Sequence, residues 1–236
     1  DAKSTRTADD KGNAIYIADA VTGKILWWTR GPSAGPEPDL YMADMKYSIP
    51  SDVRVIDING DGITDRLYAI DLGGQLWRFD INNVLVDLIG ERIIGGVIAD
   101  LQLDSDGDTS TALNNRRFYY PPDAARIESS TGSTYISISI GSGLRPSPNS
   151  SAIQDRLYVI KDYFVNTPPT TLNETATTAD DPIGYTKLYG GDLKDVSVYD
   201  SATQTAGDGS LENGWYINLP NTGDTSLAPA LTASGI

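Results

Sequence analysis

The chain has 236 residues, a formal net charge of −14 and neither cysteine nor histidine. The missing thiols exclude disulfides and thiolate metal sites, and the missing imidazoles exclude serine–histidine triads and most zinc sites. The acidic balance argues against nucleic acid, whose binding depends on basic side chains that neutralise phosphates, and it suits divalent cations. No apolar run reaches the roughly 18 residues that a membrane span requires.

Short strand-like runs dominate from the beginning of the chain. Ala14–Ala18 and Lys24–Trp28 are β-branched and aromatic, and Asp19–Gly23 between them is typical of a hairpin turn. Further strands are predicted from the same composition and alternation at Asp52–Ile58, Leu67–Ile70, Gln75–Ile81, Tyr135–Ile140, Arg156–Ile160, Val196–Tyr199 and Trp215–Leu219. Asp71–Gly74 predicts a second hairpin turn, between Leu67–Ile70 and Gln75–Ile81.

Only Val84–Ala99 is long enough for a helix, and its glycines at positions 90, 95 and 96 oppose that interpretation. Long polar or proline-rich loops are expected at about 31–50, 166–184 and 201–213. The sequence therefore predicts an all-β fold, organised as one domain over residues 1–236. The abrupt start at Asp1 and the abrupt stop at Ile236 suggest a piece of a longer protein.

Two segments resemble each other and indicate an internal repeat. Tyr16-Ile-Ala-Asp19, followed by Gly23 and the tryptophan at position 27, parallels Tyr68-Ala-Ile-Asp71, followed by Gly74 and the tryptophan at position 77. The spacing is near the ~50 residues of a β-propeller blade. A looser copy is the Asp-Arg-Leu-Tyr run at positions 155–158. We therefore expect a modified β-propeller, or part of one.

The stretch from position 57 to position 65, Asp-Ile-Asn-Gly-Asp-Gly-Ile-Thr-Asp, predicts a calcium-binding loop. Calcium prefers six to eight oxygen ligands from a flexible loop. Asp57, Asn59 and Asp61 would supply side-chain oxygens, Ile63 its main-chain carbonyl, and Asp65 the closing carboxylate. The alternative is an Asx-rich turn between strands.

Position 12 of this loop is Tyr68, where a helix–loop–helix calcium hand has a bidentate glutamate. We therefore expect an EF-hand-like loop between two strands. A second acidic loop, Asp104-Ser-Asp106-Gly-Asp108, begins a similar pattern with its glycine two positions too early, and a solvated loop is its alternative. Asp80 is interpreted as a structural turn carboxylate.

The block Asp57–Ile81, DINGDGITDRLYAIDLGGQLWRFDI, resembles the calcium-binding blade of the PilY/PilC family of type IV pilus biogenesis factors and tip adhesins. Asp57, Asn59, Asp61 and Asp65 match the family's liganding positions. The tail of the block matches at Arg66, Tyr68, Asp71, Gly74, Leu76, Trp77, Arg78, Phe79 and Asp80. Further matches lie downstream at Arg117–Asp123, Gly141–Gly143 with Arg145 and Pro148, Asp155–Tyr158, and Gly214–Trp215 with Leu219.

This resemblance implies a non-enzymatic C-terminal propeller of a bacterial cell-surface or extracellular protein. It implies a Ca²⁺ cofactor, minor pilins and the pilus tip complex as partners, and a link between calcium and the balance of pilus extension and retraction. Adhesion to host or abiotic surfaces would belong to an N-terminal part that this sequence does not contain.

Two alternatives remain open at this stage. A quinoprotein-like propeller enzyme is suggested by the run from position 15 to position 28, IYIADAVTGKILWW, although such enzymes repeat this tryptophan motif in nearly every blade. An integrin-like or carbohydrate-binding calcium propeller is the other alternative, although propellers of that type repeat the calcium loop in several blades. Aromatic residues such as Trp27, Trp28 and Trp77 could then form a sugar platform.

Overall fold

The computed structural model describes residues 8–32, 35–81, 93–105, 115–129, 132–166, 187–197, 211–221 and 223–233. Over these residues the fold is all-β, as predicted, apart from short 3-10 turns such as η1 (Gly190–Asp192). The strands are β1 (Ala14–Ala18), β2 (Ile25–Arg30), β3 (Leu40–Tyr41), β4 (Arg54–Ile56), β5 (Arg66–Ile70), β6 (Gln75–Ile81), β7 (Ile93–Asp100), β8 (Asp123–Glu128), β9 (Thr134–Gly141), β10 (Arg156–Asp162), β11 (Leu188–Tyr189), β12 (Lys194–Asp195) and β13 (Gly214–Asn218). No helix in this part of the chain could cross a lipid bilayer.

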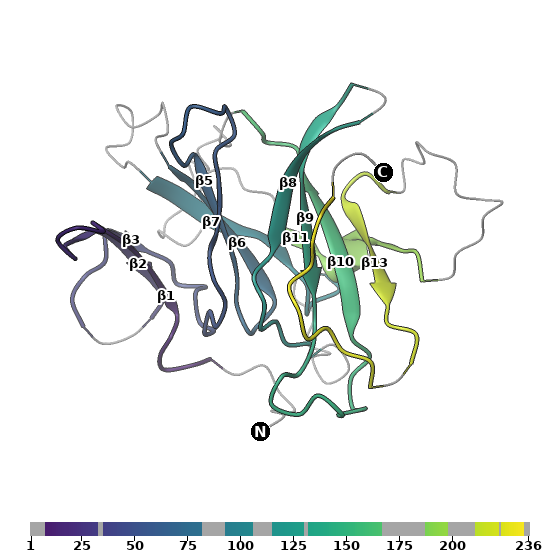
Figure 1. The fold of residues 1–236 in the computed structure, drawn as a ribbon. Coiled ribbons are helices and arrows are strands. Elements are labelled where there is room, and N and C mark those ends of the chain that lie inside the picture. Colours follow the sequence, from purple (N-terminus) through teal and green to yellow (C-terminus); the bar gives the residue numbers. More distant parts are fainter. Residues whose placement is uncertain are drawn as a thin grey trace.

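The strands form three sheets, which follow one another across the molecule in chain order (Figure 1). The first sheet has the order β1-β2-β3, the second β11-β7-β6-β5-β4, and the third β12-β13-β10-β9-β8. The second sheet contains the antiparallel meander β4 to β7, and the third pairs β8, β9, β10 and β13 in the same antiparallel manner. Each five-stranded sheet ends in a two-residue parallel strand, β11 or β12.

Both predicted hairpins are confirmed. β1 and β2 pair antiparallel around Asp19–Gly23, and β5 and β6 pair antiparallel around Asp71–Gly74. Gly23 and Gly74 have φ angles of 71° and 81°, which side chains with a Cβ rarely adopt. The turn chemistry of the sequence therefore located both reversals correctly.

Three predictions differ from the structure. The helix considered for Val84–Ala99 is wrong over its described part, because 93–100 form β7; residues 84–92 lie outside the described ranges. The strand expected at Val196–Tyr199 lies earlier in the chain, as β12 (Lys194–Asp195). Residues 198 and 199 of the expected strand are not described. The loop at 31–50 contains β3 and buries Met42 and Met45. The other two long loops fall mostly outside the described residues.

The three tyrosine repeats lie in three different sheets. Tyr16 is in β1 of the first sheet, Tyr68 in β5 of the second and Tyr158 in β10 of the third. This placement agrees with one repeat per blade. Closure of the sheets into a ring is not seen among the described residues.

Two buried clusters join the sheets face to face. One cluster packs Ile15 and Trp27 of the first sheet against Trp77 and Phe79 of the second. The other packs the opposite face of the second sheet, including Tyr68, Ile70 and Leu76, against Ile136, Ile138 and Tyr158 of the third. Alternation along β5 sends Leu67 and Ala69 to one cluster and Tyr68 and Ile70 to the other. The second sheet is therefore the buried middle layer.

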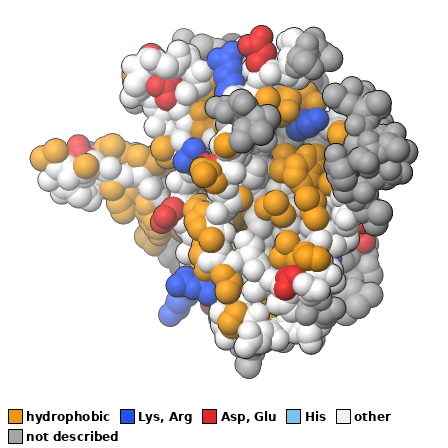
Figure 2. Space-filling view, turned by 45° about the vertical axis from the view of Figure 1, so that its right-hand side comes forward, with side chains coloured by type: hydrophobic (Ala, Val, Ile, Leu, Met, Phe, Trp, Pro, Cys, Tyr) orange, Lys and Arg blue, Asp and Glu red, His pale blue; other side chains and the backbone are white. Residues whose placement is uncertain are grey.

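The first sheet projects from the body of the molecule at the left of Figures 1 and 2. Large apolar side chains on it are exposed, among them Tyr16, Val21, Ile25 and Leu26. Tyr16 stacks on Trp28 across the β1–β2 pair, with 5.5 Å between ring centroids. Scattered exposure of this kind on one hairpin does not by itself define a site.

The end of the described chain lies along the third sheet. Ser226 donates its backbone N–H to the carbonyl of Ser142 at 3.0 Å, and the Thr232 N–H reaches an Asp123 carboxylate oxygen at 2.6 Å. The segment 223–233 thereby crosses strands that precede it by many residues, as the yellow trace in Figure 1 shows.

Gly95 in β7 is required by close packing. A Cβ at this position would lie 2.1 Å from Cδ1 of the Phe79 ring and 2.8 Å from the Arg78 carbonyl oxygen. We expect Gly95→Ala to lower the free energy of unfolding by about 1–3 kcal/mol through overpacking. Chemical denaturation would measure the loss. Gly132→Ala is an unsuitable control, because the φ of 84° at this residue adds backbone strain. The exposed Ser133→Ala is a suitable control. Equal losses of stability in Gly95→Ala and Ser133→Ala would contradict the packing argument.

Candidate metal centre

The predicted calcium loop, Asp57–Asp65, connects β4 to β5 at the edge of the second sheet. Gly60 and Gly62 have φ angles of 79° and 86°, and a Cβ at either position would meet no atom within 4 Å. Glycine is therefore needed here for its backbone conformation rather than for space. The two glycines allow the chain to curl around the side chain at the first position.

Asp57 lies at the centre of this curl. Its two carboxylate oxygens accept the N–H of Gly60 at 2.6 Å and the N–H of Gly62 at 2.8 Å. These bonds, with that from Gly62 the strongest, lower the pKa of the exposed Asp57 carboxyl because they favour its charged form. Ionised Asp57 therefore stabilises the folded loop at neutral pH, and this stabilisation is lost as the pH falls through the lowered pKa.

The other oxygen side chains of the loop also hold its backbone. Asn59 Oδ1 accepts the N–H of Asp61 at 2.9 Å, and Asp61 Oδ1 accepts the N–H of Ile63 at 2.8 Å. Asp65 Oδ2 accepts the N–H of Ile58 at 2.7 Å and closes the loop against β4. These successive Asx-type turns give the loop its shape.

The chemistry of this donor set fits calcium, because Asp57, Asn59, Asp61 and Asp65 offer side-chain oxygens and Ile63 offers its main-chain carbonyl. Within the described ranges, however, no three acidic side chains lie together as a group that could hold a metal ion. Asp57, Asn59, Asp61 and Asp65 instead face backbone N–H groups. A cation would have to draw these oxygens inward, so calcium binding stays a prediction.

Of the acidic residues in the second loop, only Asp104 is described. The carbonyl of Asp104 accepts the N–H of Gly191 at 3.1 Å, which ties it to the η1 turn. Asp106 and Asp108 lie outside the described residues. The prediction of a second metal site therefore also remains without a test.

A buried ion network lies directly beside the loop, and sequence reasoning missed it. Its members are Arg66, Tyr68, Arg78, Asp80 and Asp162, none of which is more than 7% exposed. Four of them belong to β5 and β6, whereas Asp162 ends β10 in the third sheet. The interpretation of Asp80 as a turn carboxylate is wrong, because Asp80 lies inside β6. The network joins two sheets.

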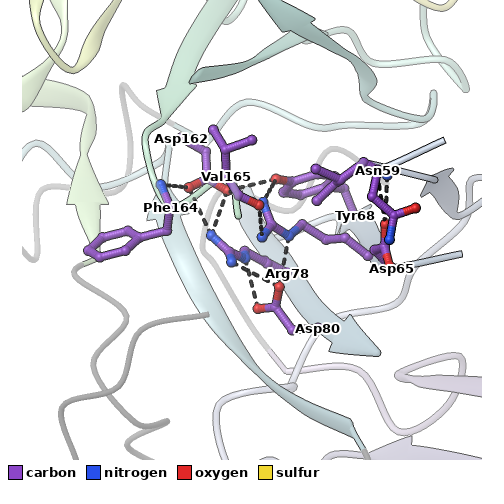
Figure 3. Close-up of polar contacts among 10 residues, drawn as sticks. Asn59, Asp65, Tyr68, Arg78, Asp80, Asp162, Phe164 and Val165 are labelled. Carbon is purple, nitrogen blue, oxygen red and sulfur yellow. Dashed lines mark hydrogen bonds and ion pairs between the residues drawn. The ribbon is translucent and has the colours of Figure 1, made fainter. Parts of the chain in front are cut away.

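The two arginines of the network bridge the two aspartates (Figure 3). Arg66 Nε lies 2.8 Å from Asp80 Oδ1, and Arg78 donates to both oxygens of Asp80 at 2.8 and 2.9 Å. Arg78 also reaches both oxygens of Asp162, at 2.8 and 2.9 Å. Two positive and two negative charges thus compensate each other in the interior, where an unpaired charge would be costly.

Tyr68 and the Arg66 guanidinium complete the link to the third sheet. The Tyr68 hydroxyl donates to Asp162 Oδ2 at 2.6 Å, and burial together with that carboxylate raises its pKa. Burial lowers the pKa of Arg66, but its electrostatic interactions with Tyr68 and with the carboxylates of Asp80 and Asp162 outweigh burial and raise the pKa overall. Arg66 also donates to the carbonyl of Val165 at 3.1 Å.

Asp71 lies outside the ion network, in the turn between β5 and β6. This buried carboxylate accepts the Gln75 N–H at 3.0 Å and the Trp77 indole N–H at 2.9 Å. The same carboxylate therefore fixes the β5–β6 turn and orients the buried indole of Trp77. The Asp-x-x-Gly-x-Leu-Trp spacing of the sequence is the signature of this turn.

The loop and the network are adjacent in the chain and in space. Asp65 accepts the Ile81 N–H through its carbonyl at 2.7 Å, and the next residue is Arg66. The loop also touches the third sheet directly, since Arg126 of β8 donates to the carbonyl of Ile58 at 3.3 Å. Arg54 of β4 forms a further bridge to Asp123 of β8 at 3.1 Å.

Comparison with solved structures identifies the fold. The C-terminal domain of Pseudomonas aeruginosa PilY1 superimposes with a TM-score of 0.54 at 18% identity, over 92% of this chain and 47% of that one. This chain has the fold of the PilY1 C-terminal domain. At this identity the likeness establishes the fold alone.

Sequence comparison supports the same relationship. A type IV pilus biogenesis factor PilY1 homolog of Xylella fastidiosa is 32% identical over 69 residues, which are 29% of this chain. The match spans 5% of that relative's length. No family model matches the chain. The resemblance to the PilY family that Asp57–Ile81 indicated is therefore confirmed, and the all-β, PilY1-like domain is the part of the prediction that the comparisons support.

Proposed function

We propose that this PilY1-like domain is a calcium-binding structural and interaction module of a type IV pilus tip-associated protein. The observation that carries the proposal is the loop Asp57–Asp65, an oxygen-only donor set curled by two glycines, in a chain with the PilY1 C-terminal fold. In this proposal the domain is not an enzyme. Calcium neutralises the clustered carboxylates and fixes the end of the second sheet.

The proposed setting is the bacterial cell surface or pilus tip. Minor pilins are the proposed partners, and the proposed outcome is control of pilus assembly, of the balance between extension and retraction, and of adhesion. The name of the Xylella relative, a type IV pilus biogenesis factor, supports this setting. Similarity to PilY1 favours it over the quinoprotein and carbohydrate-binding alternatives.

Calcium is expected to raise the melting temperature of the domain. At a calcium concentration 100 times the dissociation constant the gain is about 2.7 kcal/mol, or about 5–10 °C for a domain of this size. Asp61→Ala and Asp65→Ala are expected to abolish the gain without unfolding the domain. Thermal unfolding followed by circular dichroism, in calcium and in chelator, would measure it.

Asp44→Ala is the matched control, because Asp44 is an exposed carboxylate in a surface pair with Lys46, outside the loop. Magnesium is expected to give a smaller shift, since it tolerates fewer oxygen ligands. Identical melting curves of the unmodified domain with calcium and with chelator would refute calcium binding.

The pilus role is tested in the encoding bacterium with the complete protein. Asp61→Ala is expected to change the amount of surface pili recovered by shearing and the width of twitching zones, whereas Asp44→Ala is expected to leave both unchanged. Normal piliation and motility with Asp61→Ala would contradict control by the loop.

A further inference from the structure

Two arginines, Arg116 and Arg156, line an open cleft of about 700 Å³ at one end of the third sheet. Arg156 begins β10 and pairs with Asn218, the last residue of β13, so the cleft lies at the lower end of these two strands in Figure 1. None of the described residues that line it is acidic, although the whole chain has a formal net charge of −14. The cleft is therefore a positively charged site on an acidic protein.

The guanidinium of Arg156 is held in a fixed orientation. It stacks over the Tyr216 ring, with 3.9 Å between Cζ and the ring centroid, and its Nε donates to Asn218 Oδ1 at 2.8 Å. The Asn218 amide is fixed in turn, because its Nδ2 donates to Ser197 Oγ at 2.9 Å. In the described part of the chain, no carboxylate lies within ion-pair distance of Arg156. A stacked, planar guanidinium of this kind is pre-organised to bind an oxyanion.

Arg116 supplies the second positive charge and is only 3% exposed. Its Nε donates to the carbonyl of Gln154 at 2.8 Å, in the segment that leads into β10. Burial lowers the pKa of Arg116, and the charge of Arg156 lowers it further, although Asp155 acts in the opposite direction. The two guanidinium groups are therefore close enough to repel each other, and a bound anion would relieve that repulsion.

The remaining lining favours one class of anion. Ile217, Leu219 and Pro220 add apolar surface beside the two charges. A carboxylate on a short carbon chain matches this combination, because its planar oxygens pair with a guanidinium and its methylene groups cover apolar surface. Highly charged anions such as nucleic acid are disfavoured, because the field of a chain with a net charge of −14 repels them in proportion to their charge.

We propose that Arg116 and Arg156 form a binding site for a carboxylate group, carried either by a small organic acid or by an acidic peptide. The site goes beyond the proposed function and does not depend on it, because none of its lining residues belongs to the Asp57–Asp65 loop. It can therefore be tested without metal. The buffer must also lack carboxylate chelators, since these would compete for the two arginines.

Titration of the full chain with succinate, followed by nuclear magnetic resonance of the arginine Nε–H signals, tests the proposal. Saturable shifts are expected for Arg116 and Arg156. No shift is expected for Arg145, an exposed arginine that lies over the Tyr120 ring at 5.9 Å and outside the cleft. Absence of a saturable shift at both cleft arginines would overturn the proposal. This measurement uses the unmodified chain, so misfolding of a variant cannot obscure it.

Arg156→Lys tests the geometry of the site, because it keeps the positive charge but loses the planar fork. It is expected to weaken succinate binding roughly tenfold, which corresponds to the loss of one hydrogen bond to a charged group. Arg145→Lys is the matched control, with the same chemical change outside the cleft, and is expected to leave the affinity unchanged. Equal affinities of the two variants for succinate would overturn the proposal.

Two further probes distinguish the possible ligands. An end-blocked Glu-Gly-Glu peptide carries as many carboxylates as succinate, so tighter binding of the peptide would assign the site to acidic polypeptides. Tighter binding of succinate would assign it to free organic acids. Inorganic phosphate that binds as tightly as succinate would overturn the assignment to carboxylates. Absence of calcium binding would refute the proposed function and leave this site unaffected.

Discussion

Asp162→Ala is expected to lower the free energy of unfolding by about 3–5 kcal/mol. The substitution leaves Arg66 and Arg78 with Asp80 as their only negative partner in the network and removes the acceptor of the Tyr68 hydroxyl. Because Arg78 is fully buried, its guanidinium loses a charge partner in the interior, where an uncompensated charge is costly. Urea denaturation followed by tryptophan fluorescence would measure the loss.

The surface pair Lys46–Asp44 is the matched control for this experiment. Its nitrogen and oxygen lie 3.0 Å apart, close to the distances in the network, but its side chains are 45% and 44% exposed. Asp44→Ala should cost at most about 1 kcal/mol, because solvent screens exposed pairs. Equal losses in the two variants would show that burial of the network does not carry its effect.

Asp71→Ala is expected to have the second largest effect. It leaves the buried N–H of Gln75 and the indole N–H of Trp77 without this acceptor, and each buried unsatisfied donor costs about 1–3 kcal/mol. We also expect the near-ultraviolet circular dichroism of Trp77 to weaken, because the indole loses its fixed orientation. Chemical denaturation and the near-ultraviolet spectrum provide the two measurements.

The internal repeat supplies the control for this variant. Asp19 occupies the same position in the first hairpin and accepts the N–H groups of Val21 and Thr22 at 2.9 and 2.7 Å, but it is only partly buried. Asp19→Ala should cost about 0.5–1.5 kcal/mol, the net contribution of a typical hydrogen bond, because water can reach the N–H groups that it leaves. A loss in Asp19→Ala as large as in Asp71→Ala would mean that turn geometry, rather than burial, sets the cost.

The local features of the fold were readable from the sequence. The hairpins at Asp19–Gly23 and Asp71–Gly74 follow from turn chemistry between alternating apolar runs, and both are confirmed. The curl of Asp57–Asp65 also follows from local residues, since Gly60 and Gly62 adopt the positive φ that the pattern requires. Whether the loop holds calcium stays a prediction.

Other features depended on residues far apart in the chain. Nothing near Val84–Ala99 indicates that Gly95 lies under the Phe79 ring, so a helix could not be dismissed from periodicity alone. Asp80 looked like a turn residue because its partners, Arg66 and Arg78, become buried only when the third sheet covers them. The Asp162 carboxylate carries no local sign of its role.

The sequence alone determined the strand-rich character of the chain, its two tight turns and its acidic loop, because each depends on backbone preferences within a few residues. Tertiary structure decided which charges are buried and which sheets they join. The network pairs Arg78 with Asp162, 84 positions away in the chain, and burial of that pair depends on the packing of the second sheet against the third. A desolvated ion pair is a property of two surfaces in contact, and no single segment encodes it.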